Sequence, residues 1–157
     1  MRGKQGAYNK YRYWLAGIAS LPGRKKIYLE NYFAEAEGVY HAAQRDLDRI
    51  PLLTDCEKAG IRAAQGRTEE ALDEAVEYCA LHGVCLAVWQ EADYPGRLAH
   101  IYNPPYGLFY RGRIPDWQGK AVSVVGSRNC TCYGRQAAEH IGRELSAAGV
   151  LVISGMA

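Results

Sequence analysis

The sequence lacks the long apolar run that a membrane protein requires. No stretch approaches the roughly 20 apolar residues of a membrane-spanning helix. No apolar segment follows Arg2 and Lys4, so we expect no secretory signal. Internal repeats and low-complexity segments are also absent. The hydrophobic content of 48% is ample for a folded core. We therefore expect a cytoplasmic globular protein without a membrane partner.

Cysteine is too sparse and too irregularly spaced for a disulfide framework or a metal site. The chain has five cysteines, and only Cys130 and Cys132 lie close together in sequence. A structural zinc site needs four ligands, usually in paired C-x2-C units. We expect free thiols in a reducing compartment, with no metal and no cofactor.

The charge balance does not identify a partner. A net charge of +2 over 157 residues is too small to indicate nucleic-acid binding by itself. Any basic surface must therefore come from local clustering of Lys and Arg.

Residues 121–134, A-V-S-V-V-G-S-R-N-C-T-C-Y-G, carry the strongest functional signal. The apolar run 121–125 is typical of a strand buried on both faces. Helical spacing follows from Thr131, and Gly149 ends that helix before a second apolar strand over 150–153. This pattern predicts a βαβ unit with two parallel strands.

The loop after the first strand is expected at the carboxyl edge of the sheet, beside the positive end of the next helix. Gly126 lets backbone approach an anion, Ser127 and Thr131 add hydroxyl groups, and Arg128 suits a phosphate. These residues predict a phosphate or nucleotide cradle. In the alternative interpretation, Gly126 is only a tight turn and Arg128 a surface charge.

Two further side chains are candidates at this edge. Tyr133, in the first turn after the cradle, either stacks on a base or packs against the loop and holds Arg128 in place. Arg111, which follows the predicted strand 108–110, either lines the same edge or is a surface charge.

Residues 1–66 are predicted to form a small helical bundle. Its pattern of helix, Leu21-Pro22-Gly23, helix resembles helix-hairpin-helix and SAM-like units, which present backbone N–H groups to phosphate. Both turns depart from that pattern, and Leu52 stands where the second turn would have glycine. A structural or partner-binding bundle is therefore favoured over a DNA clamp. Residues 24–26, Arg-Lys-Lys, either contact phosphate or form a solvated basic turn.

Residues 67–157 are predicted to form a second domain of the α/β class. Its helix begins at Thr68, and strands are predicted over 84–89, 108–110, 121–125 and 150–153. We expect a partial Rossmann-like, doubly wound parallel sheet, preceded by the bundle. About four strands are fewer than such a sheet normally has, so this domain is expected to be truncated at its C-terminus.

Several stretches resemble the DNA-processing protein A family, known as DprA or Smf. They occur in the family's order over nearly the whole chain: Tyr13–Ala16 with Leu21–Gly23, Asp93–Pro95 with Leu98, I-Y-N-P-P-Y-G-L-F-Y-R-G at 101–112, V-V-G-S-R-x-x-T-x-Y-G, and V-I-S-G-x-A. The resemblance implies that Ser154 and Gly155 begin a second loop at the same sheet edge. It also implies a protein that is not an enzyme. Such a protein binds and protects incoming single-stranded DNA and helps to load RecA recombinase in natural transformation. RecA and a second copy of the chain are the implied protein partners.

The main alternative is a nucleotide-binding enzyme or sensor, similar to phosphoribohydrolases, on the same fold. Such enzymes carry a P-G-G-x-G-T-x-x-E loop, which does not occur here. No Glu or His lies in the cradle to transfer a proton. A third interpretation is an assembly module whose pocket has lost its function.

Overall fold

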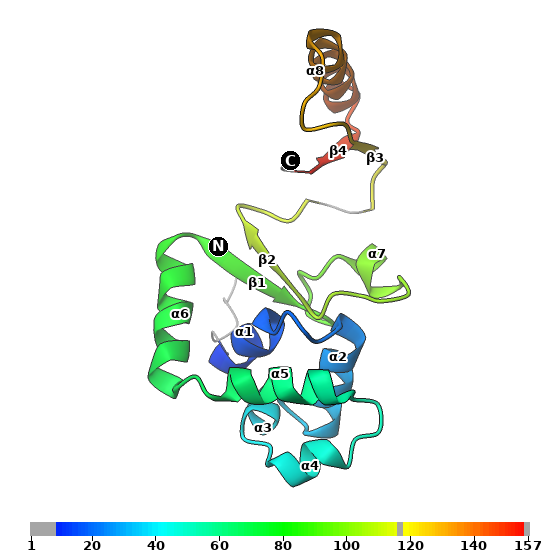
Figure 1. The fold of residues 1–157 in the computed structure, drawn as a ribbon. Helices are drawn as coiled ribbons and strands as arrows, with labels where there is room; N and C mark the ends of the chain where they lie inside the picture. The colour runs from blue at the N-terminus through cyan, green and yellow to red at the C-terminus, as the bar shows by residue number, and fades with distance from the viewer. Residues whose placement is uncertain (1–8, 116–117, 156–157) are drawn as a thin grey trace. The chain divides into compact units, whose positions relative to one another are not determined.

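The computed structural model describes residues 9–115 and 118–155. The chain forms two compact units, the N-terminal unit (Met1–Arg113) and the C-terminal unit (Ile114–Ala157) (Figure 1). Each unit has its own small sheet, so the architecture is a mixture of helices and strands.

Most of the N-terminal unit is helical. Its helices are α1 (Lys10–Gly17), α2 (Gly23–Tyr32), α3 (Ala36–Tyr40), α4 (Gln44–Asp48), α5 (Asp55–Gln65), α6 (Glu69–Leu81) and α7 (Gly96–Ala99). Side chains cap the starts of α5 and α6. Thr54 and Glu57 form a reciprocal capping box at α5, and Thr68 Oγ1 accepts a hydrogen bond from the Ala71 N–H at α6. The short helix α4 was not predicted, because sequence reasoning gave part of this stretch to a turn at Pro51.

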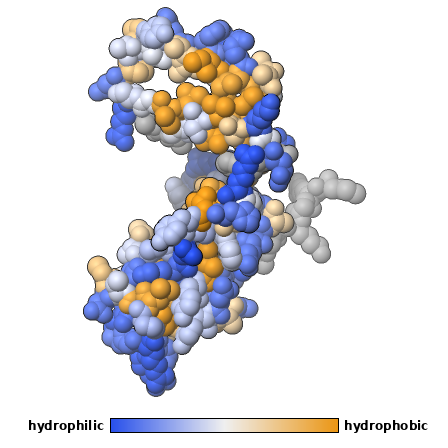
Figure 2. Space-filling view, turned by 90° about the vertical axis from the view of Figure 1, so that its right-hand side faces the viewer, coloured by the Kyte–Doolittle hydropathy of each residue, from blue (hydrophilic) through white to orange (hydrophobic). Residues whose placement is uncertain are grey.

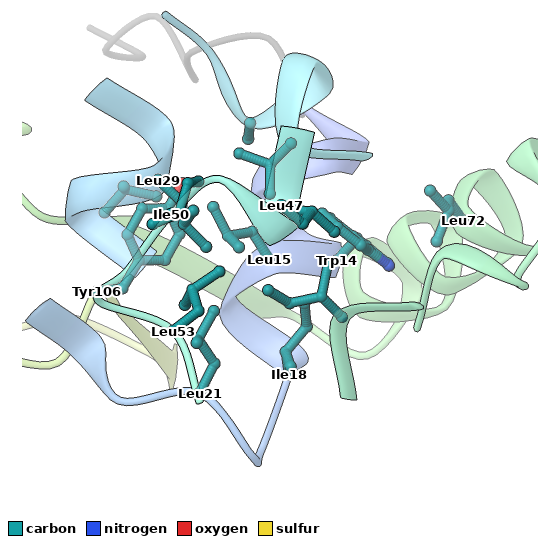
Figure 3. Packing of buried hydrophobic residues seen from close by; sticks show 14 residues of the cluster. Trp14, Leu15, Ile18, Leu21, Leu29, Leu47, Ile50, Leu53, Leu72 and Tyr106 are labelled. Carbon is teal, nitrogen blue, oxygen red and sulfur yellow. The ribbon is translucent and has the colours of Figure 1, made fainter. Parts of the chain in front are cut away.

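The core of the N-terminal unit is one apolar cluster. Its side chains point toward one another from α1, α2, α4 and the loop before α5 (Figure 3). Trp14 is buried in this cluster, and its Nε1–H donates a 2.9 Å hydrogen bond to the Ala64 carbonyl. Burying this ring therefore leaves no indole donor unpaired.

Two strands of the N-terminal unit form an antiparallel pair. They are β1 (Val84–Val88) and β2 (Gly107–Arg111), with Leu86 opposite Phe109. The sequence reasoning had assigned both strands to a doubly wound parallel sheet, which is not the pairing observed. Only the short α7 lies between them, whereas parallel neighbours usually need a longer helical crossover.

The β1–β2 pair packs with the helices. Val88 and Tyr106 belong to the same core cluster as Trp14, and the Trp89 N–H donates to the Tyr106 carbonyl at 2.8 Å. The compact units consequently divide after Arg113. The domain boundary after Gly66 stays a prediction.

The C-terminal unit is a βαβ unit, as predicted. It contains β3 (Ala121–Val124), α8 (Cys132–Ala147) and β4 (Leu151–Ser154), and the two strands are parallel. Gly149 follows α8 with φ of +71°, a conformation that glycine adopts without strain.

The strands of this unit are less buried than predicted. Val122 is exposed, Val125 lies outside β3 with 86% of its surface exposed, and no described residue of the unit is fully buried. Helix α8 packs on β4, but within residues 118–155 no second layer covers the pair. The larger Rossmann-like sheet is therefore not confirmed.

Within residues 9–115 and 118–155, no helix has both the length and the apolar character to cross a membrane. In the same part of the chain, no group of three or more His, Cys, Asp or Glu could hold a metal ion. The five cysteines are free thiols.

Candidate functional site

The parallel register of β3 and β4 defines the candidate site. Val124 pairs with Ser154, so both strands end at the same edge of the C-terminal unit. The chain leaves β3 there through the loop 125–131 and leaves β4 through Gly155. The structure therefore brings Ser154 and Gly155 to the edge from which the loop with Gly126, Ser127 and Arg128 departs.

The loop presents its polar groups to solvent. Gly126, Ser127 and Arg128 are all exposed. Among the residues that the structure describes, the Arg128 side chain has no hydrogen bond or ion pair. The guanidinium, with its planar fork of N–H donors, can therefore bind a phosphate without first breaking an internal salt bridge.

Gly126 is not required by the geometry of the turn itself. Its φ is not positive, and a Cβ at this position would meet no atom within 4 Å. The tight-turn interpretation therefore lacks a conformational reason. An open backbone here leaves room for an anion to approach the peptide groups.

Thr131 has a structural role at the start of α8, and its predicted contact with an anion stays a prediction. It is the N-cap of α8, and its Oγ1 accepts a 3.1 Å hydrogen bond from the Gly134 N–H. This bond uses one lone pair of the hydroxyl oxygen, and the O–H group can still donate a hydrogen bond to an anion. The first turn of α8 contains no acidic residue, so the positive end of the helix dipole is not offset by a carboxylate.

Tyr133 lies in the first turn of α8 with 79% of its surface exposed. A ring that packed against the loop to hold Arg128 would be largely covered. The exposure therefore favours the stacking interpretation of Tyr133 over the packing one.

Arg111 is the last residue of β2. Its grouping with Arg128 assumed one parallel sheet with a shared carboxyl edge, whereas β2 belongs to the sheet of the N-terminal unit. The structure does not supply that shared edge, and a role for Arg111 at the cradle stays a prediction.

The basic turn at the start of α2 is largely engaged within the protein. Lys25 Nζ contacts both carboxylate oxygens of Glu57, at 2.8 and 2.7 Å. Lys26 is only 7% exposed, and its Nζ donates a 2.6 Å hydrogen bond to the Ala16 carbonyl. Burial lowers the pKa of Lys26 to about 8. These two lysines are therefore not a phosphate site.

The sequence alone did not predict the contacts of Lys25 and Lys26, although helical spacing could have indicated that Lys26 is buried. Lys26 lies three residues before the buried Leu29, on the same face of α2. Only Arg24 of the basic run keeps an exposed side chain, with its guanidinium carbon 5.3 Å from the centre of the Tyr102 ring.

Gly23, which would present backbone to phosphate in a helix-hairpin-helix unit, has a structural reason in this chain. A Cβ at this position would collide with the Pro104 carbonyl oxygen. Glycine is therefore needed so that the start of α2 can lie against the Pro104-Pro105 segment.

Comparisons with known proteins agree with the resemblance noted in the sequence. The family model described as DNA recombination-mediator protein A matches residues 85–157, slightly less than half of the chain. The chain is 38% identical over 65 residues to the DNA processing protein DprA of Bacillus subtilis (strain 168). It is 33% identical over 72 residues to the protein Smf of Borreliella burgdorferi. It is 36% identical over 64 residues to the DNA processing protein DprA of Streptococcus pneumoniae.

These matches are partial on both sides. They cover 41%, 46% and 41% of this chain and 22%, 23% and 22% of the respective relatives. The matched part begins at Cys85 in β1 and includes β2, the loop 125–131 and the whole βαβ unit. Over this part, the chain is similar to the DprA/Smf proteins and to the family model of DNA recombination-mediator protein A.

Proposed function

We propose that the protein binds single-stranded DNA at the shared edge of β3 and β4 and acts in the cytoplasm as a recombination mediator. The observation that carries this proposal is the parallel register. It places the exposed loop with Arg128 and the N-terminus of α8 at the same edge as Ser154 and Gly155. The names of the relatives, which describe DNA processing, support DNA as the ligand class.

The proposed mechanism is capture of the DNA backbone. The Arg128 guanidinium and the N–H groups at the start of α8 bind phosphate oxygens. These oxygens are the same in every nucleotide, so the contacts do not depend on the base. Tyr133 adds a ring on which any base can stack. Binding at this edge is therefore expected to depend strongly on salt and weakly on sequence.

We also propose binding rather than catalysis at this edge. The loop 125–131 carries no Asp, Glu or His that could serve as a general acid or base. The protected strand would then pass to a RecA-type recombinase during natural transformation. This step, together with a homodimer of the chain, follows from the motifs that resemble the family.

The proposal is tested by measuring the affinity for fluorescent oligo-dT over a range of salt concentrations. Arg128→Ala removes one phosphate contact from an exposed position. We expect roughly five- to tenfold weaker binding at low salt. The slope of log K against log salt should fall by about 0.7, the value for one contact on a single strand.

Arg143→Ala is the matched control. Arg143 is an exposed arginine on the same helix, in its second half and away from its N-terminus. The control should keep both the affinity and the salt slope of the wild type. Equal behaviour of the Arg128 and Arg143 variants would exclude the edge as the DNA site. Displacement of oligo-dT by AMP would instead favour the mononucleotide-binding alternative.

A further inference from the structure

Helix α2 carries a line of exposed side chains that the structure of the bundle does not explain. Arg24, Tyr28 and Tyr32 follow one another at intervals of four residues, so they lie along one face of the helix. Tyr28 is 39% exposed and Tyr32 is 54% exposed. The two rings stack with their centres 5.9 Å apart and an angle of 23° between their planes.

A fourth side chain extends this line at the start of the helix. The guanidinium of Arg24 lies over the ring of Tyr102, which is 88% exposed. The Arg24 N–H also donates a 3.3 Å hydrogen bond to Asn103 Oδ1, which ties the two segments together. Arg24, Tyr28, Tyr32 and Tyr102 form what we name the α2 aromatic strip.

Packing of the N-terminal unit accounts for only part of the strip, since the Tyr32 ring meets the Phe33 ring edge-on with centres 5.0 Å apart. The buried face of α2 is formed by Lys26 and Leu29, and neither Tyr28 nor Tyr32 belongs to the core cluster or to the residues packed against it. Isolated exposed tyrosines are common, but two stacked rings in line with an arginine form a continuous surface.

The charge around the strip favours an anionic partner. The only acidic residue of α2 is Glu30, whose Oε1 accepts a 2.9 Å hydrogen bond from Arg12 Nε. In the part of the chain that the structure describes, Arg24 has no carboxylate partner. The exposed face of α2 thus combines aromatic rings with an unneutralised guanidinium.

Helix α6 provides an internal comparison. Its Tyr78 stacks on His82 with ring centres 3.9 Å apart and an interplanar angle of 28°. That helix, however, carries five acidic residues: Glu69, Glu70, Asp73, Glu74 and Glu77. Stacked rings occur on or next to both helices, but α2 carries one acidic residue and α6 carries five, so α2 is the better match for a polyanion. Figure 2 shows the mixture of hydrophobic and hydrophilic residues across one face of the molecule.

We propose that the α2 aromatic strip is a second contact surface for single-stranded nucleic acid. Bases stack on Tyr28 and Tyr32, and phosphates bind the Arg24 guanidinium. The ligand class rests on the proposed function, but the strip is a different surface from the edge of β3 and β4 and is tested separately. Stacking is tolerant of sequence, because every base has an aromatic face.

The first experiment maps contacts directly. An oligo-dT in which thymines are replaced by 5-iodouracil is bound to the protein, irradiated and digested, and the cross-linked peptides are identified by mass spectrometry. Cross-links at Tyr28 or Tyr32 are the expected result. Their absence, with cross-links elsewhere in the protein, would overturn the proposal.

The second experiment measures affinity. The double variant Tyr28→Leu/Tyr32→Leu keeps apolar bulk but removes both stacking rings, and it should bind oligo-dT about tenfold more weakly with an unchanged salt slope. Tyr78→Leu is the control and should bind as the wild type. Arg24→Ala should lower the salt slope by about 0.7. An abasic oligonucleotide that binds as tightly as oligo-dT would show that bases do not stack, and would also overturn the proposal.

The variants distinguish DNA binding at the α2 aromatic strip from DNA binding at the edge of β3 and β4. If Arg128→Ala weakens binding and the double tyrosine variant does not, the strip is excluded and the edge remains. If only the tyrosine variant weakens binding, the strip is supported and the edge proposal fails. Should the double variant not fold by circular dichroism, the cross-link map of the wild type decides. A protein that binds no oligo-dT contradicts both proposals, and loss of self-association on mutating the strip without loss of DNA binding would identify a protein contact instead.

Discussion

Lys26 is a buried lysine that should make the stability of the N-terminal unit depend on pH in the alkaline range. It is 7% exposed, and its Nζ has a single hydrogen bond, to the Ala16 carbonyl in the last turn of α1. Burial lowers the pKa of Lys26 from 10.5 to about 8. Replacing this side chain by methionine, which is of similar length and uncharged, should remove the dependence.

The direction follows from proton binding. Below pH 8 the ammonium is protonated in both states, and the folded protein bears the full cost of desolvation. Between about pH 8 and 10.5 the unfolded chain keeps a proton that the folded chain has lost, so the free energy of unfolding rises by up to about 1.4 kcal/mol per pH unit. From pH 7 to about 9.5 this amounts to a gain of about 2 kcal/mol. The carbonyl of Ala16 favours the ammonium, so we expect a measured gain between about 1 and 2 kcal/mol.

Urea unfolding followed by tryptophan fluorescence measures this gain, because Trp14 is buried in the same unit. The wild type and Lys26→Met are compared at several pH values up to about 9.5, since ionisation of unfolded tyrosines begins to contribute near pH 10. Lys10→Met is the control. Hydrogen bonding to Asp73 and the neighbouring Glu69 raises the pKa of Lys10, so this lysine stays protonated throughout. If the difference between the wild type and Lys26→Met is constant with pH, the buried ammonium is not the titrating group.

Two further substitutions test the packing of α2 and the start of α8. Gly23→Ala should destabilise the protein by about 1–3 kcal/mol in urea unfolding, because the new Cβ collides with the backbone of Pro104. Gly96→Ala, where the Cβ meets no atom within 4 Å, should cost less than about 0.5 kcal/mol, and equal costs would refute the close approach. Thr131→Ala should lower the stability of α8 by about 1 kcal/mol and speed hydrogen exchange of the Gly134 amide. Thr131→Ser should keep the hydrogen bond that caps the helix. Unchanged exchange in the alanine variant would show that the hydroxyl does not cap the helix.

The βαβ unit was predictable because its signals are local. A β-branched run, a helical apolar stripe ended by Gly149 and a second apolar run determine both the elements and their parallel pairing. The helix start at Thr68 was predictable for the same reason, since a cap depends on neighbours within one turn.

The pairing of β1 with β2 was not predictable from the same signals. An apolar strand has a similar pattern in parallel and antiparallel pairs, and the partner is chosen by contacts distant in sequence. Val88 and Tyr106 are held by the helical core, which a strand pattern does not reveal.

Within the site, sequence alone predicted the loop and the helix start but not how each side chain is used. The hydroxyl of Thr131 has two roles open to it, and only the geometry shows that it accepts from Gly134. Likewise, the sequence does not distinguish Lys25 from Lys26 at the start of α2. In the structure, Lys25 contacts Glu57, whereas Lys26 is buried and donates to the Ala16 carbonyl. Partner choice depends on the three-dimensional neighbourhood, which in this bundle comes from other helices.

The close approach of Gly23 to Pro104 has a consequence for how this protein can diverge. It joins the start of α2 to a loop inside the part that matches the family model. Mutational drift in these two stretches should therefore be coupled. A lineage that acquires a larger residue at position 23 can retain it only if the proline segment shifts as well, so the bundle inherits an evolutionary constraint from the part of the chain that matches the family model.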